Sequence, residues 1–237
     1  MTLCCLPFGA GARECLAEQR GQKTKFNRLD SAWIVKLIDP FEHGQANRFD
    51  LKSGEQTEAL MNHRQHEFDL ILAAILKQYQ LPLDGDHSVH HWARVWTNGH
   101  AVGKKNGADL EVVSLFALFH DACRENEFHD PGHGLRGGRL AKELRGELVH
   151  LDNRRFELLY EACRLHTDGL TTGDPTLLAC WDADRLDLGR VGIEPAANRL
   201  GTDAARELID WAHQRAISGH EPADVFALWQ AQRFFES

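Results

Sequence analysis

Residues 112–119, VVSLFALF, are the strongest constraint on the fold, because apolar side chains fall on every side of a helix built from them. A helix that is apolar all round has to be surrounded by other elements. From about residue 55 onward the apolar residues recur at helical spacing, and no strand alternation of any length appears. We therefore expect an all-α fold, a helical bundle over residues 53–237, with this segment as its central helix.

Caps and helix-breaking residues give the expected boundaries of the surrounding helices. A long helix begins near residue 55 and stops at Pro82, a second runs from about 88 to 103, and a third continues from Asp109 through residues 114–126. Further helices are expected near 135–149, 153–167, 175–188, 203–217 and 222–235. The helix 175–188 has the clearest ends, with Asp174 as N-cap, Pro175 at the first position and Gly189 just past the end.

Residues 1–52 show only weak periodicity and form an N-terminal extension to which the sequence assigns no role. The six cysteines include no Cys-x-x-Cys pair and follow no signal peptide, which favours a reduced, cytoplasmic setting. No window approaches the roughly 18 to 20 apolar residues of a membrane span, so no membrane partner is expected.

The charge balance limits the partners. A net charge of −8 and a pI near 5.9 argue against a protein that holds extended nucleic acid through a basic face. Small nucleotides stay open as ligands, because a few local arginines suffice to bind them. A homodimer is also left open.

His120 and Asp121 stand side by side at the end of the apolar segment. A His-Asp pair is weak evidence alone, since the chain has 14 histidines and a second such pair at 129–130 in a polar loop. The pair at 120–121 differs because a carboxylate beside a packed helix is unfavourable unless something pairs with it. A divalent ion, an arginine or a helix N-terminus would meet that need.

Helical spacing selects two more inward-facing groups. In the segment CWDADRLDLGRVG, Asp184 falls inside the apolar stripe of the helix. Asp182 points more than about 100° away from that stripe, and Asp187 lies toward one flank of it. In SVHHWARVWTNGHAV, His91 shares its face with two valines, whereas His90 projects elsewhere.

His91, His120, Asp121 and Asp184 thus come from three separate helices that point at one interior. Two imidazoles and two carboxylates are a mixed set suited to a divalent cation such as Mn, Mg, Fe, Co, Ni or Zn, with positions left for water and substrate. Buried ion pairs together with hydrogen-bonded core histidines are the alternative interpretation of the same pattern.

Three local contexts, over roughly residues 85–195, resemble the HD-domain superfamily of metal-dependent phosphohydrolases. HHWARVW resembles its His-x-x-Arg-Val motif, LFALFHDACRE its apolar helix ending in His-Asp, and CWDADRLDLGRVGI its terminal Asp-Arg-Leu segment. The resemblance implies an HD-type helical domain in which the four residues above bind the metal ion. It also implies a hydrolase that cleaves a phosphate ester, of a nucleotide or another small phosphorylated molecule, with a metal-activated water.

The position four residues after His120 departs from that family. Several of these phosphohydrolases have an acidic residue there that positions or deprotonates water, and this chain has Arg124, followed by Glu125. Two assignments are open: Glu125 acts as the general base, or Arg124 contacts the phosphate instead. The expected catalytic group is Asp121, Glu125, Arg124 and His166.

Other residues near the motifs are candidates for binding the substrate, namely Arg94, Arg185, His87 and His133. Surface or structural salt bridges are the alternative role for each arginine. His133 on a Gly-flanked loop and His166 on an inward helix face are also candidates for a phosphate contact or a second metal ion. With a second ion, the rival function is a two-iron HD-fold oxygenase; a non-catalytic helical module with a structural metal is a third alternative.

Overall fold

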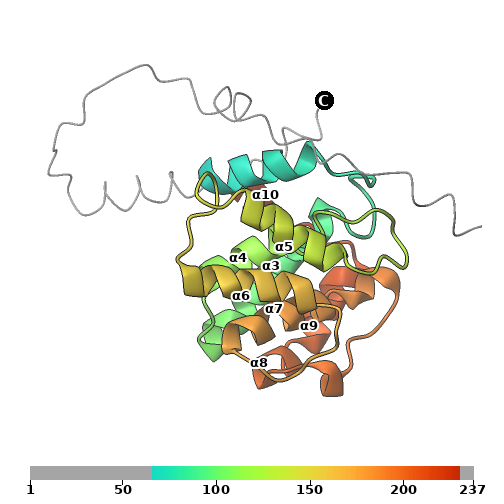
Figure 1. Cartoon of the computed structure of the whole chain (residues 1–237). Helices are drawn as coiled ribbons and strands as arrows, with labels where there is room; N and C mark the ends of the chain where they lie inside the picture. Colours follow the sequence, from blue (N-terminus) through green and yellow to red (C-terminus); the bar gives the residue numbers. More distant parts are fainter. Residues whose placement is uncertain (1–65, 230–237) are drawn as a thin grey trace, which may run out of the picture. The chain divides into compact units, whose positions relative to one another are not determined.

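The structure, a computed structural model, describes residues 66–229 of the 237-residue chain. The expected extension 1–52, the domain boundary near residue 53 and the start of the first long helix lie outside the described residues. Within them the all-α prediction is confirmed: the residues form helices and turns, with one isolated bridge between Arg145 and Val149 and no strand (Figure 1).

A helical segment over 66–76 precedes the elements that carry the site. The longer helices are α3 (Val89–Asn106), α4 (Leu110–Phe119), α5 (His133–Glu143), α6 (Asn153–Leu165) and α7 (Pro175–Leu186). Shorter elements follow: the 3-10 turns η2 (Leu188–Val191) and η3 (Ala197–Arg199), then α8 (Asp203–Arg206), α9 (Ile209–Ile217) and α10 (Ala223–Leu228).

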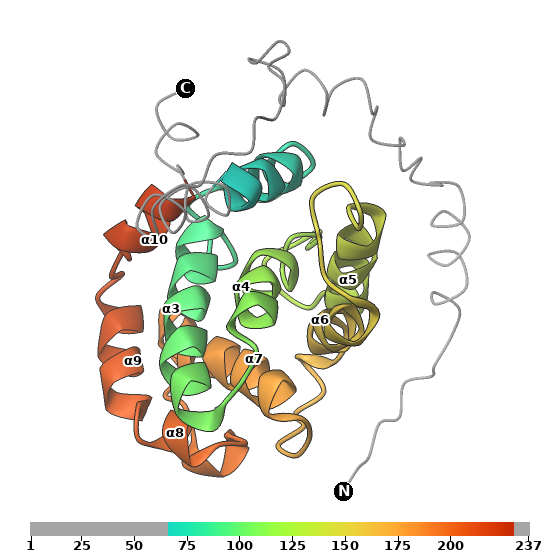
Figure 2. The same ribbon diagram turned by 90° about the vertical axis from the view of Figure 1, so that its left-hand side faces the viewer.

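The central helix is α4, as its all-round apolar composition predicts. Every residue from Val112 to Phe119 is buried. Helices α3, α5, α6 and α7 pack against it, and Figure 2 shows α4 between α3 on one side and the α5–α6 pair on the other. Its start is fixed by the side chain of Asp109, which accepts hydrogen bonds from the main-chain N–H groups of Glu111 and Val112.

The end of α4 differs from the prediction. The helix stops at Phe119 and does not continue to residue 126. The imidazole of His120 folds back so that Nδ1 donates to the carbonyl oxygens of Phe116 and Ala117, which caps the last turn with a side chain. Asp121 therefore lies just past the end of α4, with its side chain buried in the bundle interior.

Other boundaries also differ from the prediction: the first long helix ends at residue 76 and not at Pro82, and α3 continues to Asn106 where 103 was expected. Helix α5 spans His133–Glu143, where the expected range was 135–149. Helix α7 ends at Leu186, and Gly189 lies inside the following 3-10 turn against α9. The single helix expected over 203–217 is two, because the N–H groups of Glu207 and Leu208 close a turn onto Asp203 and Ala205. The cap at Asp174 and Pro175 is confirmed.

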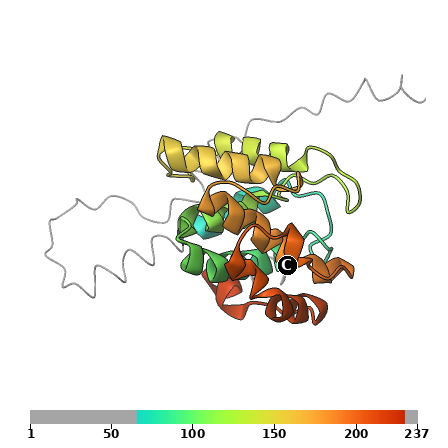
Figure 3. The ribbon, with the colours of Figure 1, turned by 90° about the horizontal axis from the view of Figure 1, so that it is seen from below.

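Two glycines let α5 lie close to its neighbours. A Cβ atom on Gly137 would sit 2.0 Å from the carbonyl oxygen of Phe119, and one on Gly134 would sit 2.1 Å from that of Cys163. No larger residue fits at either point without moving a helix. The close approach brings the start of α5 to the ends of α4 and α6, and Figure 3 shows α5 and α6 running side by side.

None of the helices in the part of the chain that the structure describes has both the length and the apolar character that a membrane crossing requires.

Replacing Gly137 with Ala should lower the free energy of unfolding by about 2 kcal/mol, because the added methyl group overlaps the Phe119 carbonyl. Urea unfolding followed by circular dichroism measures the change. Lys142→Ala, at an exposed position of the same helix, is the matched control and should shift it by less than about 0.5 kcal/mol. Equal stability of Gly137→Ala and the parent would contradict the packing described for α5.

Candidate metal centre

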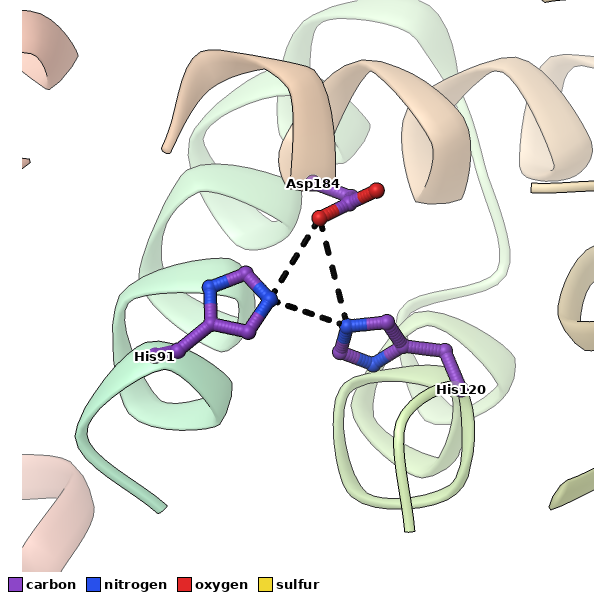
Figure 4. Close-up of side chains that lie close together, drawn as sticks. All are labelled: His91, His120 and Asp184. Carbon is purple, nitrogen blue, oxygen red and sulfur yellow. Dashed lines mark hydrogen bonds and ion pairs between the residues drawn. The ribbon is translucent and has the colours of Figure 1, made fainter. Parts of the chain in front are cut away.

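Six side chains from five segments meet at the C-terminal end of α4 and form two groups that can each hold a metal ion. Cluster 1 consists of His91, His120 and Asp184, and cluster 2 of Asp121, His133 and His166. Figure 4 shows cluster 1, with His91 on α3, His120 at the end of α4 and Asp184 on α7 pointing toward one another.

The distances within cluster 1 fit one cation. His91 Nε2 lies 3.1 Å from His120 Nε2, and Asp184 Oδ1 lies 3.4 and 4.0 Å from these two atoms. Asp121 Oδ2 adds a fourth donor, 3.6 Å from His91 Nε2 and 3.5 Å from His120 Nε2. Ligand atoms bound to one ion at about 2.0–2.2 Å lie about 3.0–3.5 Å apart, and three of these distances fall in that range. The separations of 3.6 and 4.0 Å correspond to wider angles at the ion. The four predicted ligands are thus brought around one point.

Cluster 2 uses the other oxygen of the same carboxylate. His133 Nε2 lies 2.9 Å from His166 Nε2, and Asp121 Oδ1 lies 3.1 and 3.7 Å from these nitrogens. Oδ1 is fully buried and has no hydrogen-bond donor among the described residues. Asp121 thus presents one oxygen to each cluster, which is how a carboxylate bridges two ions.

Each of the four histidines is held by its outer ring nitrogen, Nδ1. The facing oxygens are carbonyls or a carboxylate, which accept hydrogen bonds, so Nδ1 carries the proton and Nε2 turns its lone pair into the clusters. The contacts are His91 with Asp187 Oδ2 at 2.7 Å, His120 with the Phe116 and Ala117 carbonyls at 3.2 Å each, His133 with the Asp130 carbonyl at 2.6 Å, and His166 with the Cys163 carbonyl at 2.7 Å.

This arrangement makes both Nε2–Nε2 contacts unfavourable between neutral histidines. No proton remains to join the two nitrogens, so each contact sets one lone pair against another. A divalent cation between them converts the repulsion into two bonds to nitrogen. Neutral imidazoles and ionised carboxylates are the forms in which these side chains bind metal ions, so the donors present fit such ions.

The electrostatics keep most of the donors in those forms. Burial lowers the pKa of His120 to about 3. Burial alone would raise the pKa of Asp121 and of Asp184. The neighbouring histidines lower both pKa values when they carry a second proton on Nε2, and a divalent cation supplies the same positive charge. His166 differs: burial alone would lower its pKa, but the charges of Asp121 and Asp184 raise it, so a proton competes with a cation for cluster 2.

Asp187 and Arg94 form a support behind cluster 1. Asp187 Oδ2 accepts from His91 Nδ1, and Arg94 Nε donates to Asp187 Oδ1, each at 2.7 Å in the buried interior. Arg94 was predicted to bind substrate. In the structure it holds the carboxylate of Asp187, which in turn orients the imidazole of His91. Helical spacing alone put Asp187 on a flank; the turn at the end of α7 directs it inward.

Two arginines lie beside the clusters, Arg124 buried and Arg190 partly buried. Arg124 Nη1 lies 3.6 Å from Asp121 Oδ1, beside cluster 2. Arg190 Nη1 lies 4.0 Å from Asp184 Oδ1, beside cluster 1, and its Nε donates to the Asp86 carbonyl at 2.8 Å. Sequence reasoning selected Arg124 and missed Arg190, whose only signal was its position six residues after Asp184.

His87 lies one helical turn before His91, and the centres of the two rings are 6.2 Å apart. Its Nδ1 pairs with the carboxylate of Glu127 at 2.5 Å, and burial lowers the pKa of His87. Glu127 was missed because it stands in the irregular segment between α4 and α5, where no periodicity indicates direction.

Two expected site residues are not brought to the clusters. The carboxylate of Glu125 is 59% exposed and lies 3.6 Å from Arg136 Nε. Arg185 Nη1 donates to the carbonyl oxygens of Leu170 and Arg199. Asp182 is turned away as expected and accepts hydrogen bonds from residues 201–202.

Comparisons of the chain with protein-family models, with curated proteins and with solved structures found no match. Membership of the HD-domain superfamily therefore stays a prediction from the three sequence motifs.

Replacing Asp187 with Asn should weaken Mn²⁺ binding at cluster 1 by about 10- to 100-fold, because His91 loses the carboxylate that fixes its proton on Nδ1. Titration of Mn²⁺ followed by electron paramagnetic resonance of the free ion measures the dissociation constant. Asp182→Asn, an equally buried carboxylate of the same segment, is the control and should leave the constant unchanged. The same loss in both variants would argue against a specific role for Asp187.

Proposed function

We propose that the protein is a metal-dependent phosphohydrolase that cleaves a phosphate ester of a nucleotide or another small phosphorylated molecule. The observation that carries the proposal is a buried carboxylate, Asp121, shared between two clusters of metal ligands, each of which has an arginine beside it. A cytoplasmic location belongs to the same proposal and is supported by the unpaired cysteines Cys123, Cys163 and Cys180.

The two clusters would hold divalent ions, which would lower the pKa of a bound water toward about 7 and polarise a phosphoryl oxygen; which of Mn, Mg, Fe, Co, Ni or Zn serves is left open. The protein supplies the remaining charge. Arg124 and Arg190 flank the clusters, and a planar guanidinium group suits a phosphate because it donates two parallel hydrogen bonds. Together they place a positive charge beside each cluster, where the phosphate of this proposal would lie.

His87 is the proton donor to the leaving group in this proposal. Glu127 holds Nδ1–H, so Nε2 must first take up a second proton from solvent, which it then transfers to the departing alkoxide. Because burial lowers the pKa of His87, this doubly protonated form is favoured on the acidic side of neutrality. The ring stands next to His91 and therefore beside cluster 1. Glu125, the earlier candidate for acid–base work, lies at the surface beside Arg136 and has no part in the mechanism proposed here.

One observation favours a second candidate, a two-iron oxygenase. His133 and His166 give the second cluster two nitrogen donors, and imidazole with carboxylate is a ligand set suited to iron. The arginines favour the phosphohydrolase, because an anionic phosphate needs them. Two irons per chain with oxygen uptake and no ester hydrolysis would decide for the oxygenase. A non-catalytic metal-binding module ranks below both.

Metal-stripped protein reloaded with each of the six metals should hydrolyse at least one member of a panel of nucleotides and simple phosphate esters. Asp121→Ala should lower the rate at least about 100-fold, since it removes a ligand of both clusters. Glu125→Gln is the matched control and should stay within about twofold of the parent. A panel that is silent with every metal, or Asp121→Ala working as fast as the parent, would refute the proposal.

His87→Gln should lower kcat about 100-fold for an alkyl phosphate, whose leaving group needs a proton. For a nitrophenyl phosphate, whose leaving group departs as an anion, kcat should fall only a few-fold. Steady-state rates of the two esters measure the difference, and Glu127→Gln should show the same pattern to a smaller extent. Equal losses for both esters would mean that His87 acts in some way other than proton donation.

A further inference from the structure

The two clusters are unequal in negative charge. Cluster 1 contains Asp184, faces Asp121 Oδ2 and has Asp187 behind His91. Cluster 2 has one shared carboxylate oxygen, Asp121 Oδ1, and its two histidines are backed by neutral main-chain carbonyls. Arg94 pairs with Asp187 and Arg190 lies 4.0 Å from Asp184, so these two arginines offset part of the negative charge of cluster 1. Cluster 2 has the single carboxylate that it shares, so the balance of charge still favours a divalent cation in cluster 1.

Arg124 adds a positive charge beside the weaker cluster. Its Nη1 atom lies 3.6 Å from Asp121 Oδ1 and 3.3 and 3.5 Å from the two ring nitrogens of His133. The guanidinium is buried, and its positive charge is spread over a planar fork of N–H donors. It thus stands within contact distance of two of the three ligands of cluster 2.

The arginine cannot move aside without loss of other contacts. Nη2 donates to the carbonyl oxygen of Phe128 at 2.7 Å, and Nε donates to that of Asn126 at 3.3 Å. These bonds hold the segment between α4 and α5. A cation entering cluster 2 therefore meets a fixed positive charge at close range, where the buried surroundings screen little.

An anion that contacts both charges removes this conflict. A phosphate can accept hydrogen bonds from a guanidinium and also give an oxygen to a metal ion. We propose that cluster 1 binds its divalent cation alone, whereas cluster 2 binds its cation tightly only together with a phosphate group that pairs with Arg124. This inference rests on the proposed function, because the phosphate is that of the substrate.

Linkage makes the coupling reciprocal. If phosphate strengthens binding of the second cation by some factor, the second cation strengthens binding of phosphate by the same factor. The centre would then be completed only when a substrate arrives, and the protein at limiting metal would hold one ion per chain. Arg124 therefore has two roles in this proposal: its charge weakens cation binding at cluster 2, and its guanidinium pairs with the phosphate that restores it.

Titration of Mn²⁺, followed by electron paramagnetic resonance of the free ion with and without inorganic phosphate, tests the proposal. We expect one tight and one weak equivalent, and a second equivalent that tightens about tenfold or more when phosphate is present. Arg124→Gln should tighten the second equivalent without phosphate and reduce the phosphate effect to less than about twofold. Arg124→Lys keeps the charge and should resemble the parent.

Two further variants assign the equivalents. His166→Ala should remove the second equivalent and leave the first. Arg139→Gln is the matched control, because it removes a positive charge from the exposed face of α5, the helix that begins at His133, and it should leave the second equivalent and its response to phosphate unchanged. Circular dichroism verifies that each variant is folded, and the comparison with and without phosphate in the parent protein needs no variant.

Two equal Mn²⁺ sites, a second equivalent that phosphate leaves unchanged, or a full phosphate effect in Arg124→Gln would each overturn the inference. These are binding measurements and need no turnover. Coupled binding in a protein that hydrolyses no ester would therefore contradict the proposed function alone, and hydrolysis without coupled binding would contradict this inference alone.

Discussion

The structure depends on how the buried carboxylate of Asp121 is satisfied. An ionised carboxylate inside a helical bundle is strongly unfavourable unless charges or hydrogen-bond donors surround it. Here one oxygen faces His91 and His120 and the other faces His133 and His166. Since each imidazole has its proton on the outer nitrogen, these neighbours offer lone pairs, and the arrangement is favourable when cations complete it. The stability of the buried interior and the ability to bind cations therefore depend on the same side chains.

Five helices, α3 to α7, each bring a side chain to Asp121 or to the residues around it. The apolar helix α4 ends where its own His120 caps the last turn, which delivers two ligands from adjacent residues. The glycines of α5 let its first residue, His133, come within reach of His166 at the end of α6. Asp187 leaves the end of α7 toward His91 and is held there by Arg94. A helix cap, two glycines and a buried ion pair, far apart in the sequence, thus all position ligands of the same candidate metal centre.

Helical periodicity predicted what lies on regular helices. It selected His91 over His90 and Asp184 over Asp182, and the structure has these two residues together in cluster 1. It also identified the buried central helix and most element positions. Residues in turns escaped it: Glu127 and Arg190 follow helix ends, where direction is set by tertiary contacts and no fixed angle per residue applies. The continuation of α4 to residue 126 failed for a related reason, because a side-chain cap ended the helix earlier than composition indicates.

The central proposal is that Asp121 gives one oxygen to each of two divalent cations. Anomalous X-ray scattering from crystals grown with Mn²⁺ and inorganic phosphate tests it most directly. The account predicts two peaks about 3.5–4 Å apart, one beside His91, His120 and Asp184 and the other beside His133 and His166, each in contact with a different oxygen of Asp121. The absence of any peak next to Asp121, or a single peak with His133 and His166 turned away from it, would contradict the account.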